Sequence, residues 1–287
     1  MRSHSQPALA QRLPPETFFI ASAIFHYLGP AFATLLFAHV APIGVAWLRI
    51  TSAALIFAFW QRPWRLFCEL RQEGRRTVIA LGVVLAAMNI TFYLALSRLP
   101  LATVAAIEFL GPIALAVFGL RGRRNTFALA LAAAGVTQLV HLGGEGAAIG
   151  YVFAFANCAL FALYVVLGHR IAEGGGSRGI HCLGFAMLVA AIAASPIGIA
   201  DAASAFMSPS LLAAAIGVGL CSSVIPYVLD QFAMARLTRG TFALMLTLLP
   251  ATATVVGVLV LRQIPTPSEC AGIALVIAGV TLHRRAT

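Results

Sequence analysis

The chain has 287 residues, of which 61% are hydrophobic and 10% are charged, and its mean hydropathy is +0.94. Soluble domains carry about 25% charged residues, so the composition excludes a soluble enzyme, a secreted module and a disordered protein. It predicts an all-α polytopic membrane protein. The 19 basic residues are all arginines and give a net charge of +10. Because they lie in short segments between apolar runs, we expect them to contact membrane lipids and not nucleic acid.

Apolar runs of about 20 residues are long enough to cross a bilayer as helices. The sequence predicts ten such spans, at residues 17–38, 42–60, 77–96, 102–120, 126–142, 150–170, 181–198, 210–235, 240–261 and 268–283. Residues 1–16 are expected to form a cytoplasmic N-terminal segment.

Arginine distribution predicts the direction of these spans. Counted along ten spans, sixteen arginines fall in the termini and loops of one side, and the other side has only Arg98 and Arg262. Arg49, the remaining arginine, lies inside the second span. Because positively charged loops stay in the cytoplasm, the sequence predicts a multi-pass protein with both termini in the cytoplasm.

An internal repeat organises the chain. Residues 98–119 align without gaps on residues 236–257, with eight identical pairs that include Pro112 and Pro250. Further on, residues 135–137 and 279–281 both read Gly-Val-Thr. We therefore expect two five-helix repeats, 17–142 and 148–283, within one integrated membrane domain.

An odd number of spans in each repeat requires the second copy to run in the opposite direction. Inverted repeats are typical of secondary transporters, which bind substrate near the membrane midplane between the two copies. The predicted fold is thus ten transmembrane helices, arranged as two inverted five-helix repeats around a central cavity.

Glu108 is the leading candidate for a substrate-binding residue. It lies about six residues inside the fourth span, or about 9 Å at 1.5 Å per residue, where a carboxylate is costly and usually faces a cavity or a partner. It can meet a substrate ammonium, carry a proton, or serve as a structural carboxylate between helices. Its repeat counterpart is Leu246, so the two halves differ chemically at this point.

Arg49 and two asparagines are further polar candidates within spans. Arg49 can bind a substrate carboxylate through its planar guanidinium, brace neighbouring helices, or reach a membrane surface. Asn89 and Asn157 are candidate amide donors for a substrate.

Other candidates are aromatic, imidazole or proline residues at helical spacing. The cavity candidates are Phe161, Tyr93, Tyr164, Tyr227 and His26, each of which could instead serve helix packing. Pro112 and Pro250 interrupt helical hydrogen bonding and are candidate hinges or simple packing kinks. Asp230 is a candidate gate residue or a partner of Arg236.

Three segments resemble the drug/metabolite transporter superfamily, namely residues 44–49, 108–112 (Glu-Phe-Leu-Gly-Pro) and 222–227 (Ser-Ser-Val-Ile-Pro-Tyr). Within it the chain is similar to the EamA-type amino-acid exporters, closest to the threonine/homoserine exporter branch. The resemblance implies ten helices around a central cavity and efflux of amino acids or related metabolites. Phe161 stands where such exporters often have a tryptophan, and Gly111 stands where aromatic-amino-acid exporters often have a bulky aromatic residue.

The predicted function is export of small amino acids or related zwitterionic metabolites across a bacterial inner membrane by alternating access, either in exchange for protons or by facilitated diffusion. Export of cationic or aromatic drugs and metabolites is the first alternative, and an intramembrane enzyme is the second. The sequence has no catalytic, nucleotide-binding or metal-binding motif, so no cofactor and no metal is expected. Oligomeric state is not predicted.

Overall fold

The computed structural model describes residues 14–111, 114, 123–139, 146–172, 176–226, 228–229 and 248–282. Every regular element in these residues is a helix. The long ones are α2 (Pro15–Leu36), α3 (Pro42–Gln61), α5 (Gln72–Leu96), α8 (Arg123–Leu139), α9 (Ala147–Ala172), α10 (Gly176–Asp201), α12 (Pro209–Gly219), α15 (Leu248–Leu261) and α16 (Pro267–Leu282). The shorter ones are α4 (Trp64–Glu69), α6 (Leu101–Glu108), α11 (Ala203–Phe206) and the π-helical turn η1 (Leu220–Val224).

Each of the ten predicted spans overlaps at least one of these helices. Within the described ranges, five helices are long and apolar enough to cross a membrane: α2, α3, α5, α9 and α10. Shorter apolar helices lie at Thr126–Leu139, Pro209–Val224, Leu249–Leu261 and Pro267–Gly279. Proline is the first residue of α2, α3, α12 and α16, a position where its missing N–H costs nothing and its fixed φ suits a helix. The prediction of an all-helical polytopic membrane protein is confirmed.

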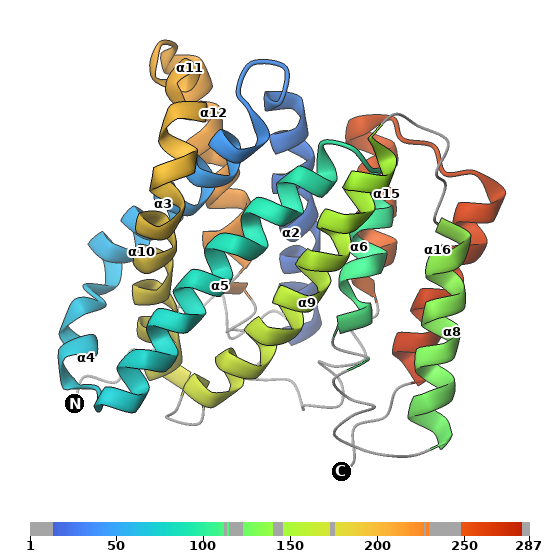
Figure 1. The fold of residues 1–287 in the computed structure, drawn as a ribbon, viewed down its shortest axis with the longest axis horizontal. Helices are drawn as coiled ribbons and strands as arrows, with labels where there is room; N and C mark the ends of the chain where they lie inside the picture. The colour runs from blue at the N-terminus through green and yellow to red at the C-terminus, as the bar shows by residue number, and fades with distance from the viewer. Residues whose placement is uncertain are drawn as a thin grey trace.

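The links between helices separate into two ends of the bundle (Figure 1). The links 37–41 and 262–266 and the short helix α11 lie at the upper end in this view, and α4 lies at the lower end. Arg262 belongs to the upper end, whereas Arg62, Arg71 and Arg75 flank α4. In the described residues, the arginine-rich and arginine-poor links predicted from the sequence thus lie at opposite ends.

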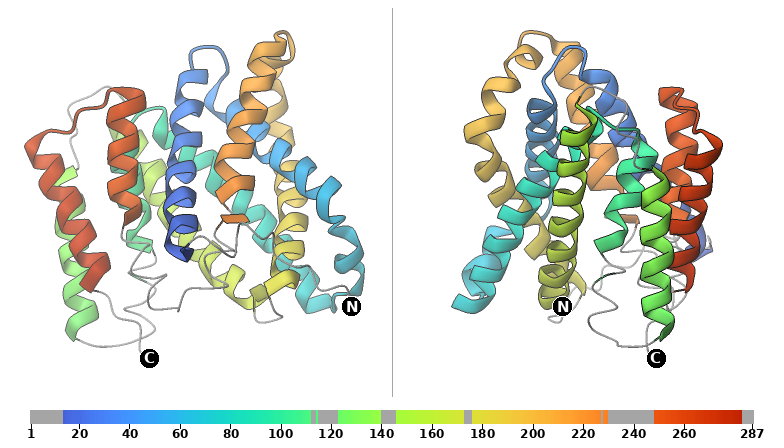
Figure 2. Two further views of the ribbon diagram at one scale, coloured as in Figure 1. Left: turned by 180° about the vertical axis from the view of Figure 1, so that it is seen from behind. Right: turned by 45° about the vertical axis from the view of Figure 1, so that its right-hand side comes forward.

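Corresponding helices of the two halves run in opposite directions. In Figures 1 and 2, α2 runs toward the end that carries link 37–41, whereas α9, its counterpart, runs away from it. The contacts are also paired between the halves: α3 packs on α10, α6 on α15 and α8 on α16, so three helices touch their own counterparts. The contact of α5 with α9 has its equivalent in the contact of α2 with α12 and η1. Such exchangeable contacts are expected of an inverted repeat.

The pair α8 and α16 shows this exchange at residue level. A Cβ at Gly135 would lie 2.6 Å from the carbonyl oxygen of Gly272, and a Cβ at Gly279 would lie 2.7 Å from the carbonyl oxygen of Ala128. Gly135 corresponds to Gly279 in the repeat, and by the same spacing Ala128 corresponds to Gly272. Swapping the two halves therefore turns each of these close contacts into the other. Both contacts depend on small residues, which let membrane helices approach closely.

Gly272→Ala is expected to lower the stability of the folded protein by about 1–3 kcal/mol, the usual cost of overpacking. The new methyl group would lie 2.7 Å from the carbonyl oxygen of Gly135, so α8 and α16 would have to separate. Gly217→Ala in α12 is the control, because nothing lies within 4 Å of a Cβ there. Thermal unfolding in one detergent measures both variants, and equal melting temperatures would contradict the assigned contact.

Candidate functional site

Two of the predicted site residues meet between α6 and α9. Glu108, the last residue of α6, is buried, and Asn157 of α9 is fully buried. The side-chain amide Nδ2 of Asn157 donates a hydrogen bond of 3.1 Å to Oε1 of Glu108. Glu108 is therefore a polar group inside the bundle and does not face lipid.

Gly111 explains how α9 comes so close to the segment that carries Glu108. A Cβ at Gly111 would lie 2.7 Å from the carbonyl oxygen of Cys158, so any larger residue would push the two backbones apart. Because Cys158 directly follows Asn157 in α9, this close approach brings the amide within reach of the carboxylate. Close packing thus requires a glycine at position 111 of this chain, where exporters of aromatic amino acids often have a bulky residue.

Arg49 of α3 is held by three acceptors on two other helices. Nε donates to Oγ of Ser223 at 3.2 Å, Nη2 donates to the carbonyl oxygen of Ser222 at 3.2 Å, and Nη1 donates to the hydroxyl of Tyr93 at 3.4 Å. The guanidinium carbon also lies 5.5 Å from the centre of the Tyr93 ring, within the range of a cation–π contact. Of the roles predicted for Arg49, bracing of helices is the one that this geometry shows.

Pro226 explains why the carbonyl of Ser222 is available to Arg49. In an α-helix that carbonyl would accept the N–H of residue 226, but proline has none. The chain forms the π-helical turn η1 here, and the N–H of Ile225 bonds to Leu220, five residues earlier. On the other side, the Ser22 hydroxyl of α2 donates to the carbonyl of Pro226 at 3.2 Å. Turns of this kind are frequent at functional sites in membrane and soluble proteins.

Arg49 and Glu108, two ionisable groups of opposite sign, are both buried inside the bundle. Among the described residues, Arg49 nevertheless donates only to neutral acceptors, and Oε1 of Glu108 accepts only from Asn157. Three of the five N–H groups of the guanidinium are used in these bonds. A positive and a negative group thus share the interior, and each keeps hydrogen-bonding capacity for a further partner.

Tyr27 of α2, which is not among the predicted site residues, is a buried tyrosine whose ring packs against His26. Its side chain is 1% exposed, and its hydroxyl has no hydrogen-bond partner among the described residues. The sequence signal that could have identified Tyr27 is the same as for Tyr93 and Tyr164, namely a tyrosine inside an apolar span. His26, one of the predicted site residues, is half-buried and packs edge-on against Tyr27 with ring centres 5.4 Å apart.

Aromatic rings continue the site along α9. Phe109, next to Glu108, lies edge-on to Phe161 with ring centres 6.4 Å apart, and Phe161 stacks on Tyr164 at 5.9 Å. Phe161 and Tyr164 are half-buried. These two predicted cavity residues therefore form one aromatic surface beside the carboxylate.

The remaining predicted residues have the following positions. The amide Nδ2 of Asn89 donates to the carbonyl of Leu85 in its own helix at 2.8 Å. Pro250 is buried in α15, and its carbonyl accepts the Thr254 hydroxyl at 2.9 Å. Pro112, Tyr227 and Asp230 lie outside the described residues.

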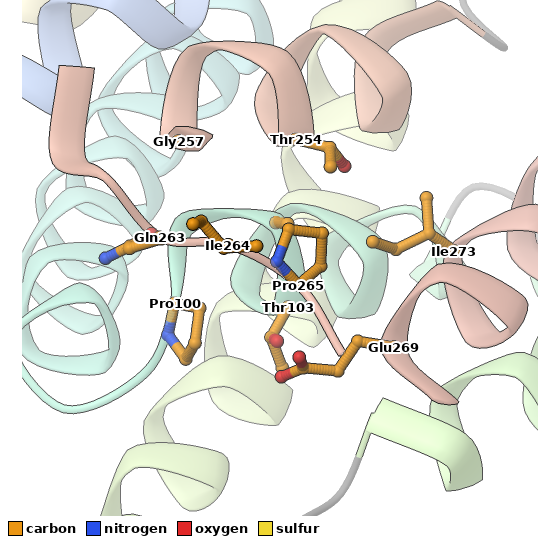
Figure 3. Close-up of a pocket in the computed structure, with 10 residues that line it drawn as sticks. Pro100, Thr103, Thr254, Gly257, Gln263, Ile264, Pro265, Glu269 and Ile273 are labelled. Atoms are coloured by element: carbon orange, nitrogen blue, oxygen red, sulfur yellow. The ribbon is translucent and has the colours of Figure 1, made fainter. Parts of the chain in front are cut away.

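A pocket of about 180 Å³ lies between α6, α15 and α16, at the arginine-poor end of the bundle (Figure 3). Its wall includes Thr103, Thr254 and Glu269 as polar members. The link after α15 closes one side, where Oε1 of Gln263 accepts the N–H of Leu101 at 3.0 Å. Thr103 and Glu108 are five residues apart on α6, about 7.5 Å along the axis, so the pocket lies outward of the Glu108 site. In the described residues, no group of three or more His, Cys, Asp or Glu side chains could hold a metal ion.

Comparisons with known proteins agree with this architecture. Residues 148–284 match the EamA-like transporter family. The threonine/homoserine exporter RhtA of Escherichia coli K12 is 32% identical over 253 residues, which are 87% of this chain and 84% of that protein, and RhtA of Salmonella typhimurium SL1344 matches to the same extent.

One crystal structure aligns over 93% of this chain and 96% of its own, with a TM-score of 0.56 at 19% sequence identity, and supports the fold alone. Identity of this level to full-length relatives, together with the family match, confirms the resemblance found in the sequence. The chain belongs to the EamA-like transporter family and is a membrane transporter, not an enzyme.

Proposed function

We propose that this protein exports small amino acids of the threonine and homoserine type across a bacterial inner membrane by alternating access. Two independent observations support this proposal. Its curated relatives are threonine/homoserine exporters at 32% identity over most of the chain. A buried carboxylate, Glu108, is held between the two halves by Asn157. The contact of buried Glu108 with Asn157 is the observation that carries the assignment of the site.

Glu108 and Arg49 fit the two charges of an amino acid. In this proposal the substrate ammonium binds the carboxylate of Glu108, and the aromatic surface of Phe161 and Tyr164 borders the site. Arg49 keeps η1 in place and supplies a positive charge on the carboxylate side of the substrate. A charge in this interior is costly, so an amino acid that offers both signs is a better ligand than a singly charged one.

The inverted arrangement supplies the transport step. The repeats 17–142 and 148–283 are proposed to rock against each other, exposing the site to one side of the membrane at a time. The pocket lined by Thr103 and Glu269 lies at the arginine-poor end, which is the outer side if the arginine-rich end and both termini are cytoplasmic. It is proposed to be the outer vestibule, closed over Leu101 by Gln263.

Counterflow in proteoliposomes tests the function directly. Vesicles loaded with unlabelled threonine or homoserine are expected to accumulate labelled threonine, and vesicles without protein are not. A screen of the twenty amino acids as competitors, with an aromatic amine and a quaternary ammonium dye, identifies the substrate class. Absence of threonine counterflow, together with counterflow of the dye, would replace amino-acid export with export of cationic compounds.

A pH gradient in a second series separates proton exchange from facilitated diffusion. If Glu108 carries a proton in exchange for substrate, an inward proton gradient is expected to drive threonine efflux beyond equilibrium. Equal efflux with and without the gradient would assign facilitated diffusion.

A further inference from the structure

The pocket at the arginine-poor end has polar side chains from three helices in its wall (Figure 3). Thr103 comes from α6, Thr254 from α15 and Glu269 from α16. Pro265 and Ile273 are among the apolar members of the wall. Among the described residues, no arginine or histidine lines the pocket, so its wall contains no positive charge to balance the carboxylate of Glu269.

Glu269 is fixed in position by the start of α16. Its Oε2 accepts the N–H of Thr266 at 2.7 Å, and its own N–H donates to Oγ1 of Thr266 at 3.3 Å. This reciprocal pair is a capping box, which satisfies two N–H groups at the start of a helix. Within the described residues only Oε2 is used, so Oε1 is left to accept from a ligand. The capping box therefore holds a negative charge at the pocket in one orientation.

The two threonines add oxygen atoms that can accept hydrogen bonds. The hydroxyl of Thr254 donates to the carbonyl of Pro250 at 2.9 Å, so it has only lone pairs left to offer. Thr103 is 2% exposed, and the hydrogen bonds of the described residues leave its hydroxyl unpaired. Buried hydroxyls are usually paired, and the pocket that Thr103 lines is the space in which a partner can lie.

A primary ammonium group matches this set of side chains. It is positive and has three N–H donors and no acceptor, so it can donate to Oε1 of Glu269 and to the two threonine oxygens. An anion would be repelled by the carboxylate, and an apolar molecule would leave Thr103 unpaired. The pocket volume of about 180 Å³ is below the range of about 300–1,000 Å³ for drug-sized ligands, so the expected occupant is small.

We infer that this pocket is a second substrate site, where Glu269 and Thr103 bind the ammonium of an amino acid that is leaving the Glu108 site. The identity of the ligand rests on the proposed function, whereas the preference for an ammonium rests on the pocket alone. Thr103 is about 7.5 Å from Glu108 along α6, so the two carboxylates offer successive positions for one ammonium. Because the wall has no positive group for the substrate carboxylate, the outer site is expected to bind more weakly, which favours release.

Equilibrium binding of labelled methylammonium to the purified full-length protein in detergent tests the site. Glu108→Gln serves as the background, so that the inner carboxylate does not contribute. In this background Glu269→Gln is expected to weaken binding about 10-fold, and Thr103→Val about 5-fold. Glutamine also serves in a capping box, so Glu269→Gln removes the charge and keeps the start of α16. Threonine is expected to displace the label.

Glu73→Gln in the same background is the matched control. Glu73 is an exposed carboxylate in the first turn of α5 that does not line the pocket, so binding is expected to stay unchanged. Equal binding by the Glu269→Gln and Glu73→Gln variants would overturn the inference. Displacement of the label by sodium as readily as by methylammonium, or no displacement by threonine, would also overturn it.

The proposed function and this site can fail separately. Wild-type exchange of threonine without binding that depends on Glu269 would remove the outer site and leave the proposed function in place. Binding of methylammonium that depends on Glu269, in a protein that does not exchange threonine, would remove the proposed function and assign the pocket to a different amine.

Discussion

Glu108→Gln is expected to reduce threonine counterflow at low substrate concentration by about 10–100-fold. A hydrogen bond to a charged group contributes about 1.5–3 kcal/mol, and each 1.4 kcal/mol corresponds to a factor of ten in affinity. Glutamine has the size of glutamate and keeps a carbonyl oxygen that can accept from Asn157, so the helix contact between α6 and α9 is retained. Only the negative charge that meets the ammonium is lost.

Measurement of this variant requires equal amounts of folded protein in the vesicles. Glu73→Gln is the control, because Glu73 is an exposed carboxylate in the first turn of α5 and is expected to leave counterflow unchanged. If Glu108→Gln transports threonine at the wild-type rate, Glu108 does not bind the substrate and is a structural carboxylate between α6 and α9.

Arg49→Met is expected to lower the free energy of unfolding by about 2–4 kcal/mol. Removal of the guanidinium takes a donor from the buried Ser222 carbonyl, to which Pro226 offers no N–H, and an unsatisfied buried group costs about 1–3 kcal/mol. The variant also loses the bonds to Ser223 and Tyr93, which link α3 to η1 and α5. Thermal unfolding in detergent measures the loss.

Arg75→Met is the matched control for this variant. Arg75 also donates to two backbone carbonyls, those of Phe67 and Cys68, but it is exposed, so water can replace it. Its loss is expected to change stability by less than about 1 kcal/mol. Equal melting temperatures for the two variants would show that Arg49 does not stabilise η1.

Arg49→Lys separates charge from geometry at the same position. Lysine keeps the positive charge but presents its donors from one atom, whereas the planar guanidinium reaches three acceptors at once. We therefore expect a stability between those of Arg49→Met and the wild type, measured in the same unfolding experiment.

Much of the fold could be predicted because the membrane imposes length and charge rules on the sequence itself. Every predicted span overlaps a helix, and the described arginine-rich and arginine-poor links lie at opposite ends. The Gly-Val-Thr repeat was visible as a pattern, and the structure gives it a physical role in the contacts of Gly135 and Gly279 with the facing helix. Periodicity and self-similarity carry this information because they follow from backbone geometry that is the same in every span.

The candidate site could be predicted only residue by residue. Glu108 and Asn157 were selected separately because polar groups in apolar spans are costly, but nothing in the sequence indicates that their side chains are 3.1 Å apart. Tyr27 is not among the predicted residues, because a tyrosine in an apolar span is ordinary until its hydroxyl is found without a partner in the described part of the chain. For Arg49, three roles were open, and its distances to Ser222, Ser223 and Tyr93 showed that it braces helices.

The sequence by itself determined the class of protein, the helical spans, the repeat and the identity of the one acidic residue inside the fourth span. These follow from composition, period and charge count, which are local or statistical properties of the chain. Only the tertiary structure decided which polar atoms meet and which remain unpaired, because that depends on the separation and rotation of helices far apart in sequence. A single glycine, Gly111, sets one such separation, and the partner of Glu108 follows from it.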